Sequence, residues 1–420
     1  MPMTLAEKIV ARASGREQVR PGEIVTCSVD LAMCHDSSGP RRYGPRLKEL
    51  GASVWDPTKV VVVSDHFVPA VDAESARILK LTRDWVAENK ISHFYDMEGI
   101  CHIKLAEGGH LKPGMFVCGG DSHSTNGGAF GCYMAGYGAT EMTGVMVTGE
   151  IWVKVPETIR VNITGDFGPA VSAKDIMLHL CATLGMDNHF RVVEYGGPTV
   201  RSMSMRERMV LTNMAAELGA ETGIIEGDEI TAGWLREMGA EVPADVLDWK
   251  GDDDAGYLAQ HQLDIQSLPP QVAAPHSPEN SSAVENHTGT AVDQCYIGAC
   301  TGAKLSDLHM VAKVLKGHRV AKGTRLLVAP SSTAAMRDAA ADGTLQIITE
   351  AGGIMLPSGC GACAGLGAGI LAAGETCISS TNRNFQGRMG SGDSEVYLAS
   401  PYTVAASAIT GRIADPREYV

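Results

Sequence analysis

The segment "TKVVVVSDHFVP", residues 58–69, and the segment "VDAESARILKLTRDWVAENK" that follows it at 71–90 decide the fold class. The four valines predict a short buried strand, and Ile78, Leu81 and Trp85 recur at a spacing that marks one apolar helix face. The same order returns in "QCYIGACTGAKLSDLHMVAKVLKG" and "TRLLVAPSSTAAMRDAAADG". Strand, loop and helix in alternation are typical of an α/β fold with substantially parallel sheets, which bind ligands beyond the carboxyl ends of their strands.

Two changes in composition divide the chain into three predicted parts. Residues 267–285, "SLPPQVAAPHSPENSSAVE", are rich in Pro, Ser and Ala and lack periodicity, which predicts a linker between domains. A softer boundary follows "GEIWVKVPETIRVNITG", where Pro156 and Gly165 bracket a strand. We therefore expect α/β domains at 1–160, 161–285 and 286–420, the second ending in the linker and the third carrying the cluster cysteines described below.

Composition and charge exclude several classes of protein. The net charge of -14 argues against a nucleic-acid or membrane-surface role, because those partners are themselves anionic, and an anionic substrate would need a locally basic pocket. The sequence contains no run of about 18 apolar residues, so we expect no membrane-spanning helix. The eleven cysteines are scattered and follow no signal-like segment, so we expect a cytoplasmic protein whose cysteines mostly fill the core.

Three cysteines form the first candidate site. Cys360 and Cys363 are three positions apart in "SGCGACAGLG", and Cys300 follows a strand-like run in "YIGACTGAKL". A CxxC pair fits half of a zinc site, a redox pair, part of an iron-sulfur site or chance. Three thiolates are one short of the usual four for a [4Fe-4S] cluster, which would leave one iron open to act as a Lewis acid. Spacing alone leaves plain buried cysteines equally open.

Several polar motifs also follow apolar runs. Two of them pair an aspartate with a histidine, and such a pair fixes the imidazole tautomer and raises its basicity. Taken singly, each motif fits a helix cap, a core histidine, a solvated loop or an exposed helix face better than a functional site, and it is their number that points to a site. The residues are Asp65 and His66; Asp121, Ser122 and His123; His35 in "CHDSS"; His102 in "GICH"; Asn213 and Glu217, one helical turn apart; and Asn382, Arg383 and Arg388 in "STNRNFQGRMGS".

Together these motifs resemble the aconitase family, and most closely the large subunits of two-protein 3-isopropylmalate dehydratases and their homoaconitase-like relatives. The resemblance runs nearly end to end, through "SDH", "GICH", "GGDSHSTNGGAFG", "NMAAELGA", "YIGACTG", "GCGAC", "STNRNFQGRMG" and "SEVYLASPYTVAASAITGRI". It implies an aconitase-type fold of three α/β domains around an iron-sulfur cluster. Because this chain stops at Val420, we expect it to lack the C-terminal swivelling domain of single-chain members.

The resemblance also implies a role for each matched residue. One [4Fe-4S] cluster per subunit would be held by Cys300, Cys360 and Cys363, with one iron lacking a protein thiolate. The catalytic residues implied are Asp65, His66, His102, Asp121, His123 and Glu217. The substrate-binding residues implied are His35, at a position where aconitases have glutamine, Ser122, Asn213, Asn382, Arg383 and Arg388.

The activity implied is that of a hydro-lyase acting on a 2-hydroxy di- or tricarboxylate, foremost the isomerisation of 3-isopropylmalate and 2-isopropylmalate in leucine biosynthesis. Alternatives are hydratases acting on homoaconitate, citramalate, 2,3-dimethylmalate or maleate. A separate small subunit would supply the swivelling domain and a catalytic serine. A different class is a non-catalytic metal-binding or iron-sensing protein, but the net charge of -14 and 5% aromatic content argue against RNA binding.

The sequence departs from the family pattern beside the first cluster cysteine. Family members usually read "SCTN" where this chain reads "ACTG", so Ala299 and Gly302 replace a serine and an asparagine. We expect the lost side-chain hydrogen bonds to alter either the hold on the cluster or the shape of the substrate pocket.

Overall fold

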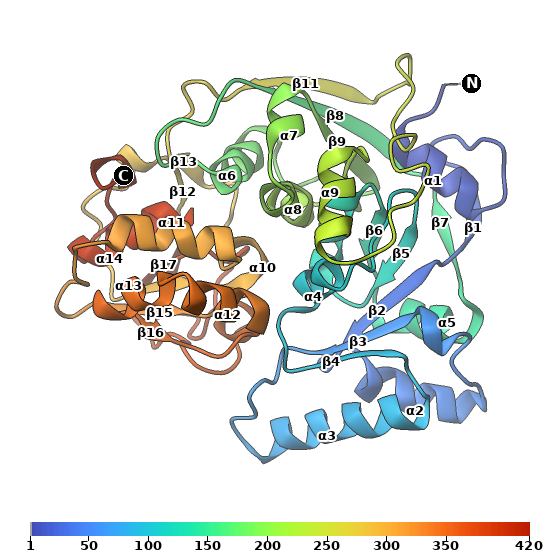
Figure 1. Cartoon of the computed structure of the whole chain (residues 1–420), viewed down its shortest axis with the longest axis horizontal. Helices are drawn as coiled ribbons and strands as arrows, with labels where there is room; N and C mark the ends of the chain where they lie inside the picture. Colours follow the sequence, from blue (N-terminus) through green and yellow to red (C-terminus); the bar gives the residue numbers. More distant parts are fainter. Residues whose placement is uncertain (1) are drawn as a thin grey trace.

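A computed structural model describes residues 2–420 of the chain, which form three large β-sheets, a two-stranded ribbon and the helices that cover them (Figure 1). The strand and helix predicted from residues 58–90 are confirmed as β3 and α3. Helix α3 begins at an N-cap, Asp72, whose carboxylate accepts the backbone amide of Ser75 at 2.7 Å. Ile78 and Trp85 of this helix are buried as predicted, but Leu81 is only partly buried and Leu79 takes the inner position.

The first sheet is entirely parallel and has the strand order β4-β3-β2-β5-β6. Its strands are β2 (Leu31–His35), β3 (Val60–Ser64), β4 (His93–Asp96), β5 (Phe116–Gly119) and β6 (Tyr133–Gly136). From β2 the chain builds outward through β3 and β4, and then returns to add β5 and β6 on the other side. The strand order therefore reverses between β2 and β5, where doubly wound sheets form a ligand-binding crevice at the carboxyl ends.

The second sheet is also parallel, with the order β10-β9-β8-β11. Its strands are β8 (Glu157–Thr164), β9 (Arg191–Gly196), β10 (Thr222–Ile225) and β11 (Ala259–Asp264). A separate antiparallel ribbon pairs β1 (Ile24–Ser28) with β7 (Glu150–Lys154).

The third sheet has the order β13-β12-β18-β17-β14-β15-β16, in which only the pairings of β12 are antiparallel. Its strands are β12 (Gln271–Ala273), β13 (Ser281–Ala283), β14 (Gln294–Ile297), β15 (Arg325–Val328), β16 (Ile354–Met355), β17 (Thr376–Ser379) and β18 (Glu395–Ala399). The order reverses between β14 and β17, so this sheet also has a crevice at its carboxyl edge.

Helices cover the faces of these sheets, and those of the C-terminal part gather at the left of Figure 1. The α-helices are α1 (Leu5–Ala13), α2 (Pro40–Leu50), α3 (Ala73–Glu88), α4 (Cys101–Glu107), α5 (Ala139–Thr148), α6 (Ala173–Leu184), α7 (Pro198–Ser202), α8 (Met205–Asn213), α9 (Glu229–Glu237), α10 (Ala299–Gly302), α11 (Leu305–Leu315), α12 (Thr333–Ala341), α13 (Thr344–Glu350) and α14 (Pro401–Thr410). The 3-10 helices are η1 (Pro57–Lys59), η2 (Ser122–Phe130), η3 (Met214–Ala216), η4 (Val284–Asn286), η5 (Gly361–Ala364) and η6 (Pro416–Glu418).

The hydrophobic cores connect the sheets to one another. One core packs Val161 and Val193 of the second sheet with Tyr296 and Leu398 of the third. Another hydrophobic core packs side chains of the first sheet against α8, α9 and Cys300, which lies at the edge of the third sheet. Burial of apolar surface therefore fixes the relative positions of the three sheets, and with them the side chains at their carboxyl edges.

Residues 267–285, which the sequence predicts to be a linker, contain two β-strands. Residues 271–273 and 281–283 form β12 and β13, two strands of the third sheet, and Val272 and Ala273 are fully buried. Strands of three residues are too short to show an alternation of apolar and polar residues, so Pro-rich composition dominates the pattern. The domain bounds themselves stay a prediction; the large sheets occupy 31–136, 157–264 and 271–399.

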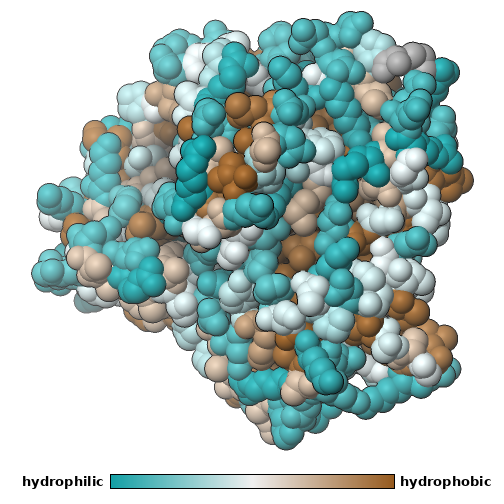
Figure 2. Space-filling model, turned by 45° about the vertical axis from the view of Figure 1, so that its right-hand side comes forward, coloured by the Kyte–Doolittle hydropathy of each residue, from teal (hydrophilic) through white to brown (hydrophobic). Residues whose placement is uncertain are grey.

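The outer surface is mainly hydrophilic on the face drawn in Figure 2, where brown hydrophobic side chains lie in small groups among teal ones. Among residues 2–420, the helices are all too short or too polar to cross a membrane.

A buried carboxyl group on β9 makes the stability of the fold depend on pH. Glu194 is 1% exposed and accepts hydrogen bonds from the Ala6 amide of α1 at 3.0 Å and from the Tyr257 hydroxyl at 3.1 Å. Burial outweighs these hydrogen bonds and raises the pKa of this carboxyl from 4.5 to about 7. Between these two pH values the folded protein retains a proton that the unfolded chain has lost, so this group lowers stability as pH rises.

We predict that Glu194→Gln stabilises the protein at pH 8 by up to about 3 kcal/mol and changes little at pH 5, because an amide cannot ionise. Denaturant unfolding of both proteins between pH 5 and pH 8 measures the difference. Parallel stability profiles for wild type and variant would contradict the assignment.

Candidate active site

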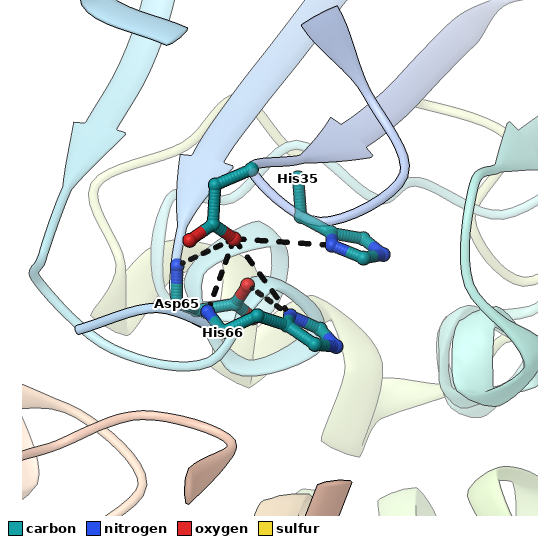
Figure 3. A group of neighbouring side chains, drawn as sticks. His35, Asp65 and His66 are labelled. Atoms are coloured by element: carbon teal, nitrogen blue, oxygen red, sulfur yellow. Dashed lines mark hydrogen bonds and ion pairs between the residues drawn. The ribbon is translucent and has the colours of Figure 1, made fainter. Parts of the chain in front are cut away.

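Two stacked imidazoles lie at the crevice of the first sheet. His35 is the last residue of β2, and Asp65 and His66 follow β3 directly. The rings of His35 and His66 lie 4.0 Å apart at 11°, and His66 Nδ1 is 2.7 Å from Asp65 Oδ1 (Figure 3). The carboxylate orients the His66 ring and leaves its Nε2 directed away from Asp65.

A third carboxylate, Asp36, fixes the loop that carries this pair. Its two oxygens accept the backbone amides of Asp65, His66 and Phe67 at 3.3, 3.0 and 2.8 Å. His35, Asp36, Asp65 and His66 lie close enough to hold a metal ion, but these amides already occupy the Asp36 oxygens. Asp36 is not among the residues predicted from the sequence, although it follows His35 directly in the "CHDSS" motif.

Asp121, the N-cap of η2 after β5, lies among four imidazoles. Its Oδ1 is 2.9 Å from His102 Nε2 and accepts the His123 backbone amide at 2.8 Å. Its Oδ2 is 3.7 Å from His35 Nε2 and 3.9 Å from His66 Nε2. Burial opposes ionisation of Asp121, but the surrounding imidazoles outweigh burial and hold the pKa of this carboxyl well below its ordinary value.

The stacked imidazoles differ in protonation. Burial would lower the pKa of His66, but the carboxylates of Asp65, Asp36 and Asp121 outweigh burial and raise it to about 9. Burial, together with the neighbouring His66 charge, lowers the pKa of His35 to about 4. At neutral pH the pair therefore combines a protonated His66 with a neutral His35, so the crevice contains a proton donor.

Glu217 links this crevice to the third sheet. It lies after η3, is 1% exposed, and its Oε1 is 2.9 Å from His123 Nε2 and 2.7 Å from Arg383 Nε. Burial would raise the pKa of Glu217, but the charges of His123 and Arg383 outweigh burial and lower it to about 2. A single ionised carboxylate therefore joins side chains from all three sheets.

The three cysteines lie at the edge of the third sheet and close to both crevices. Cys300 follows β14 in α10, and Cys360 and Cys363 lie at η5, after β16. The thiol of Cys360 hydrogen-bonds to that of Cys363, and its backbone amide donates to the carbonyl of Asp65 at 2.8 Å. The Cys300 sulfur accepts a hydrogen bond from Asn213 Nδ2 at 3.2 Å, and Asn382 Nδ2 donates to Asn213 Oδ1 at 2.5 Å.

The chemistry of this group fits an iron-sulfur cluster. The hydrogen bond from Cys360 lowers the pKa of the Cys363 thiol, with further lowering from Arg388 and His123, so this sulfur favours the thiolate form that binds metals. Four buried polar atoms in the network and near the thiols have no hydrogen-bond partner among residues 2–420, which is expected around a bound group with polar atoms. These atoms are Arg388 Nε, Glu217 Oε2, His102 Nδ1 and Ser358 Oγ.

The structure joins nearly all the residues singled out in the sequence into one network. Ser122 is the exception, because it is exposed between Asp121 and His123. Arg388 enters the group through its charge near Cys363. The roles assigned to these residues stay predictions.

The "ACTG" variation has a structural counterpart. Ala299 has a φ of 69°, in the left-handed region, where the chain turns from β14 toward Cys300. A Cβ atom added to Gly302 would lie only 2.5 Å from the carbonyl oxygen of Ser380, so the Ser380 backbone fills the space that a side chain would need.

Comparison with known proteins places this geometry in a family. Residues 7–411 match the aconitase family (aconitate hydratase). The chain belongs to the aconitase family. It is 46% identical to the 3-isopropylmalate dehydratase large subunit 1 of Methanopyrus kandleri, over 100% of both chains. It is 44% identical to the methanogen homoaconitase large subunit of Methanocaldococcus jannaschii, over 98% of this chain and 99% of the relative.

A solved structure supports the family assignment at the level of fold. The holo form of aconitase X from Thermococcus kodakaraensis superposes with a TM-score of 0.52 over 91% of this chain and 94% of that chain. The sequence identity of 14% limits this likeness to the fold, which confirms the aconitase-type α/β architecture expected from the sequence.

We predict that Asp65→Asn lowers the pKa of His66 well below 9, because it removes the nearest carboxylate and leaves burial opposed only by Asp36 and Asp121. NMR titration of the histidine rings measures this value. Asp56→Asn, at a partly exposed cap before β3 and so at the opposite end of that strand from His66, serves as the control and should leave the His66 titration unchanged. A His66 pKa that stays near 9 in Asp65→Asn would contradict the assignment.

We also predict that Gly302→Ala destabilises the protein by about 1–3 kcal/mol, because the new methyl group overlaps the Ser380 backbone. Gly233→Ala in α9 is the matched control, since its Cβ would meet open space within a helix, where alanine is favoured. Thermal unfolding of both variants makes the comparison. Equal stability of Gly302→Ala and wild type would show that the loop adapts freely.

Proposed function

We propose that this chain is the large, cluster-bearing subunit of a [4Fe-4S] hydro-lyase that dehydrates and rehydrates a 2-hydroxy di- or tricarboxylate. The main reaction proposed is the isomerisation of 3-isopropylmalate and 2-isopropylmalate in leucine biosynthesis. The observation that carries the proposal is the meeting of Cys300, Cys360 and Cys363 with the network of imidazoles and carboxylates. This meeting occurs at the carboxyl edges of the first and third sheets, each of which reverses its strand order once.

In this proposal Cys300, Cys360 and Cys363 hold the cluster, and one iron lacks a protein thiolate. When bound, the cluster supplies a Lewis acid that weakens the bond to the departing hydroxyl group. Asn213 and Asn382 orient the site by hydrogen bonds at the Cys300 sulfur and to each other.

Arg383 and Arg388 bind the substrate carboxylates. Arg383 donates its Nε to Glu217, which leaves its two terminal nitrogens available to a carboxylate, and Arg388 brings a second guanidinium. Two cationic groups at fixed positions hold a dicarboxylate so that its reacting carbon-hydrogen bond faces a base.

The imidazole and carboxylate pairs move the protons. His66, held protonated by Asp65, donates a proton to the departing hydroxide, which leaves as water. The carbon-bound proton passes to a base, and the electron pair that it leaves forms the double bond. Water addition with the opposite regiochemistry then gives the isomer, with the proton returned to carbon.

A partner completes the proposed enzyme. The relatives described above carry the name large subunit, and this chain covers 99–100% of their length. We propose a small subunit that supplies the swivelling domain and a catalytic serine, and a cytoplasmic location for the complex.

The names of the two relatives indicate two different substrates. Identity to the 3-isopropylmalate dehydratase subunit is 46% and to the homoaconitase subunit 44%, so a second candidate activity is the hydration of homoaconitate. The two substrates differ in the group beyond the shared carboxylates, which is an isopropyl group in one and a carboxylate-bearing chain in the other. Assaying both with the same preparation distinguishes the two activities.

The test of function begins with the chain purified without oxygen, followed by counting of iron and sulfide and by EPR with and without ferrous iron. We predict a three-iron signal that disappears when iron is added, and hydro-lyase activity when the chain is co-expressed with its small subunit. Cys363→Ser should lose the cluster and reduce activity by at least a hundredfold, because a ligand is removed. Cys181→Ser, a buried cysteine outside the site, is the control.

Two results would refute the proposed function. One is zinc or no metal in a folded wild-type chain. The other is full activity of Cys363→Ser with the partner present.

A further inference from the structure

Lys174 is a buried lysine that the reaction proposed above does not use. It lies in the first turn of α6, in the second part of the chain, and is 1% exposed. Its Nζ donates to the carbonyl oxygen of Thr381 at 2.5 Å, to that of Ser380 at 3.3 Å and to Thr301 Oγ1 at 3.4 Å. It therefore joins α6 to the loops that follow β14 and β17, next to Cys300 and Asn382.

The lack of a carboxylate partner sets Lys174 apart. Three lysines are buried among residues 2–420, and the other two pair with acids: Lys304 with Asp307 at 2.6 Å and Lys104 with Glu107 at 3.0 Å. No described carboxylate oxygen lies within 4.0 Å of Lys174 Nζ. A buried ammonium bound only to neutral oxygens is costly, so an anion is expected nearby in the working protein.

Most of the groups that favour the charged form of Lys174 belong to the site. Burial lowers the pKa of Lys174 to about 8, and the charges opposing burial are those of Glu217, Cys363, Cys300 and Cys181, of which only Cys181 lies outside the site. Glu217 is already shared between His123 and Arg383. The cysteines balance a cation only as thiolates, which is the state in which they bind a metal.

We propose that Lys174 is a positioning residue for the iron-sulfur cluster, whose ammonium ties the loops after β14 and β17 together and balances the negative charge of the cysteine thiolates. This inference rests on the proposed function, because it needs a cluster at the three cysteines. Contact with substrate does not account for Lys174, since the three hydrogen bonds of its ammonium go to residues that follow β14 and β17.

A charge role makes the reduction potential the most direct measurement. Reduction adds one negative charge to the cluster, and a nearby cation in a poorly polarisable interior favours the reduced form. Replacing Lys174 with a neutral residue should therefore lower the midpoint potential. We expect about a tenfold change in the equilibrium constant, which is about 59 mV for a one-electron couple.

The experiment is an EPR-monitored redox titration of the full chain with its cluster assembled, for wild type, Lys174→Met and Lys174→Gln. Methionine removes the charge and the hydrogen bonds, whereas glutamine keeps donors for the loop carbonyls. Both should lower the potential, and Lys174→Arg should retain that of wild type. Lys313→Met, on the exposed face of α11, makes the same change in net charge at a solvated position and should leave the potential unchanged.

Unfolding of the iron-free proteins separates a charge role from a purely structural one. Without the cluster, Lys174→Met should be at least as stable as wild type, because it removes an unpaired buried charge. An unchanged potential in both neutral variants would overturn the proposal, and so would failure of both to fold without iron. A shift of the midpoint potential in Lys313→Met as large as that in Lys174→Met would also overturn the proposal. A wild-type chain that binds no iron would instead refute the proposed function, and this inference with it.

Discussion

The shared carboxylate of Glu217 is the interaction on which the site depends. It lies in the second part of the chain and meets His123 from the first sheet and Arg383 from the third. A fully buried carboxylate is stable only when its partners remain in place, and loss of one partner of such a group costs about 3–5 kcal/mol. The three sheets therefore cannot shift apart at this point without exposing or stranding a charge.

The position of the site follows from the topology of the first and third sheets. Each reverses its strand order once, between β2 and β5 and between β14 and β17, and each reversal leaves a crevice at the carboxyl edge. The first crevice supplies imidazoles and carboxylates, and the second supplies Cys300 and the arginine loop. The backbone hydrogen bond from Cys360 to Asp65 links the two edges directly. Groups for proton transfer and for metal binding are thus brought together at the carboxyl edges of two sheets.

The sequence predicted the α/β class and most of the site because both depend on local patterns. Apolar runs identified the strands, and the polar residues just after them are those that the structure brings together. Asp36 and Lys174 were missed, since their contacts join residues distant in the chain and neither position differs locally from a surface residue. The strands β12 and β13 were missed because a three-residue strand gains its stability from sheet neighbours and carries little pattern of its own.

The charges of the site differ from those of the whole molecule. The chain carries a net charge of -14, which would repel an anionic substrate at long range. Within the site, however, the carboxylates of Asp65, Asp121 and Glu217 each lie beside an imidazole or Arg383. Lys174 and Arg388 remain as cations without a carboxylate partner among residues 2–420. Their charges act on Cys363, so an anionic cluster and a dicarboxylate would each find a cationic partner there, and exposed surface charges are screened by salt.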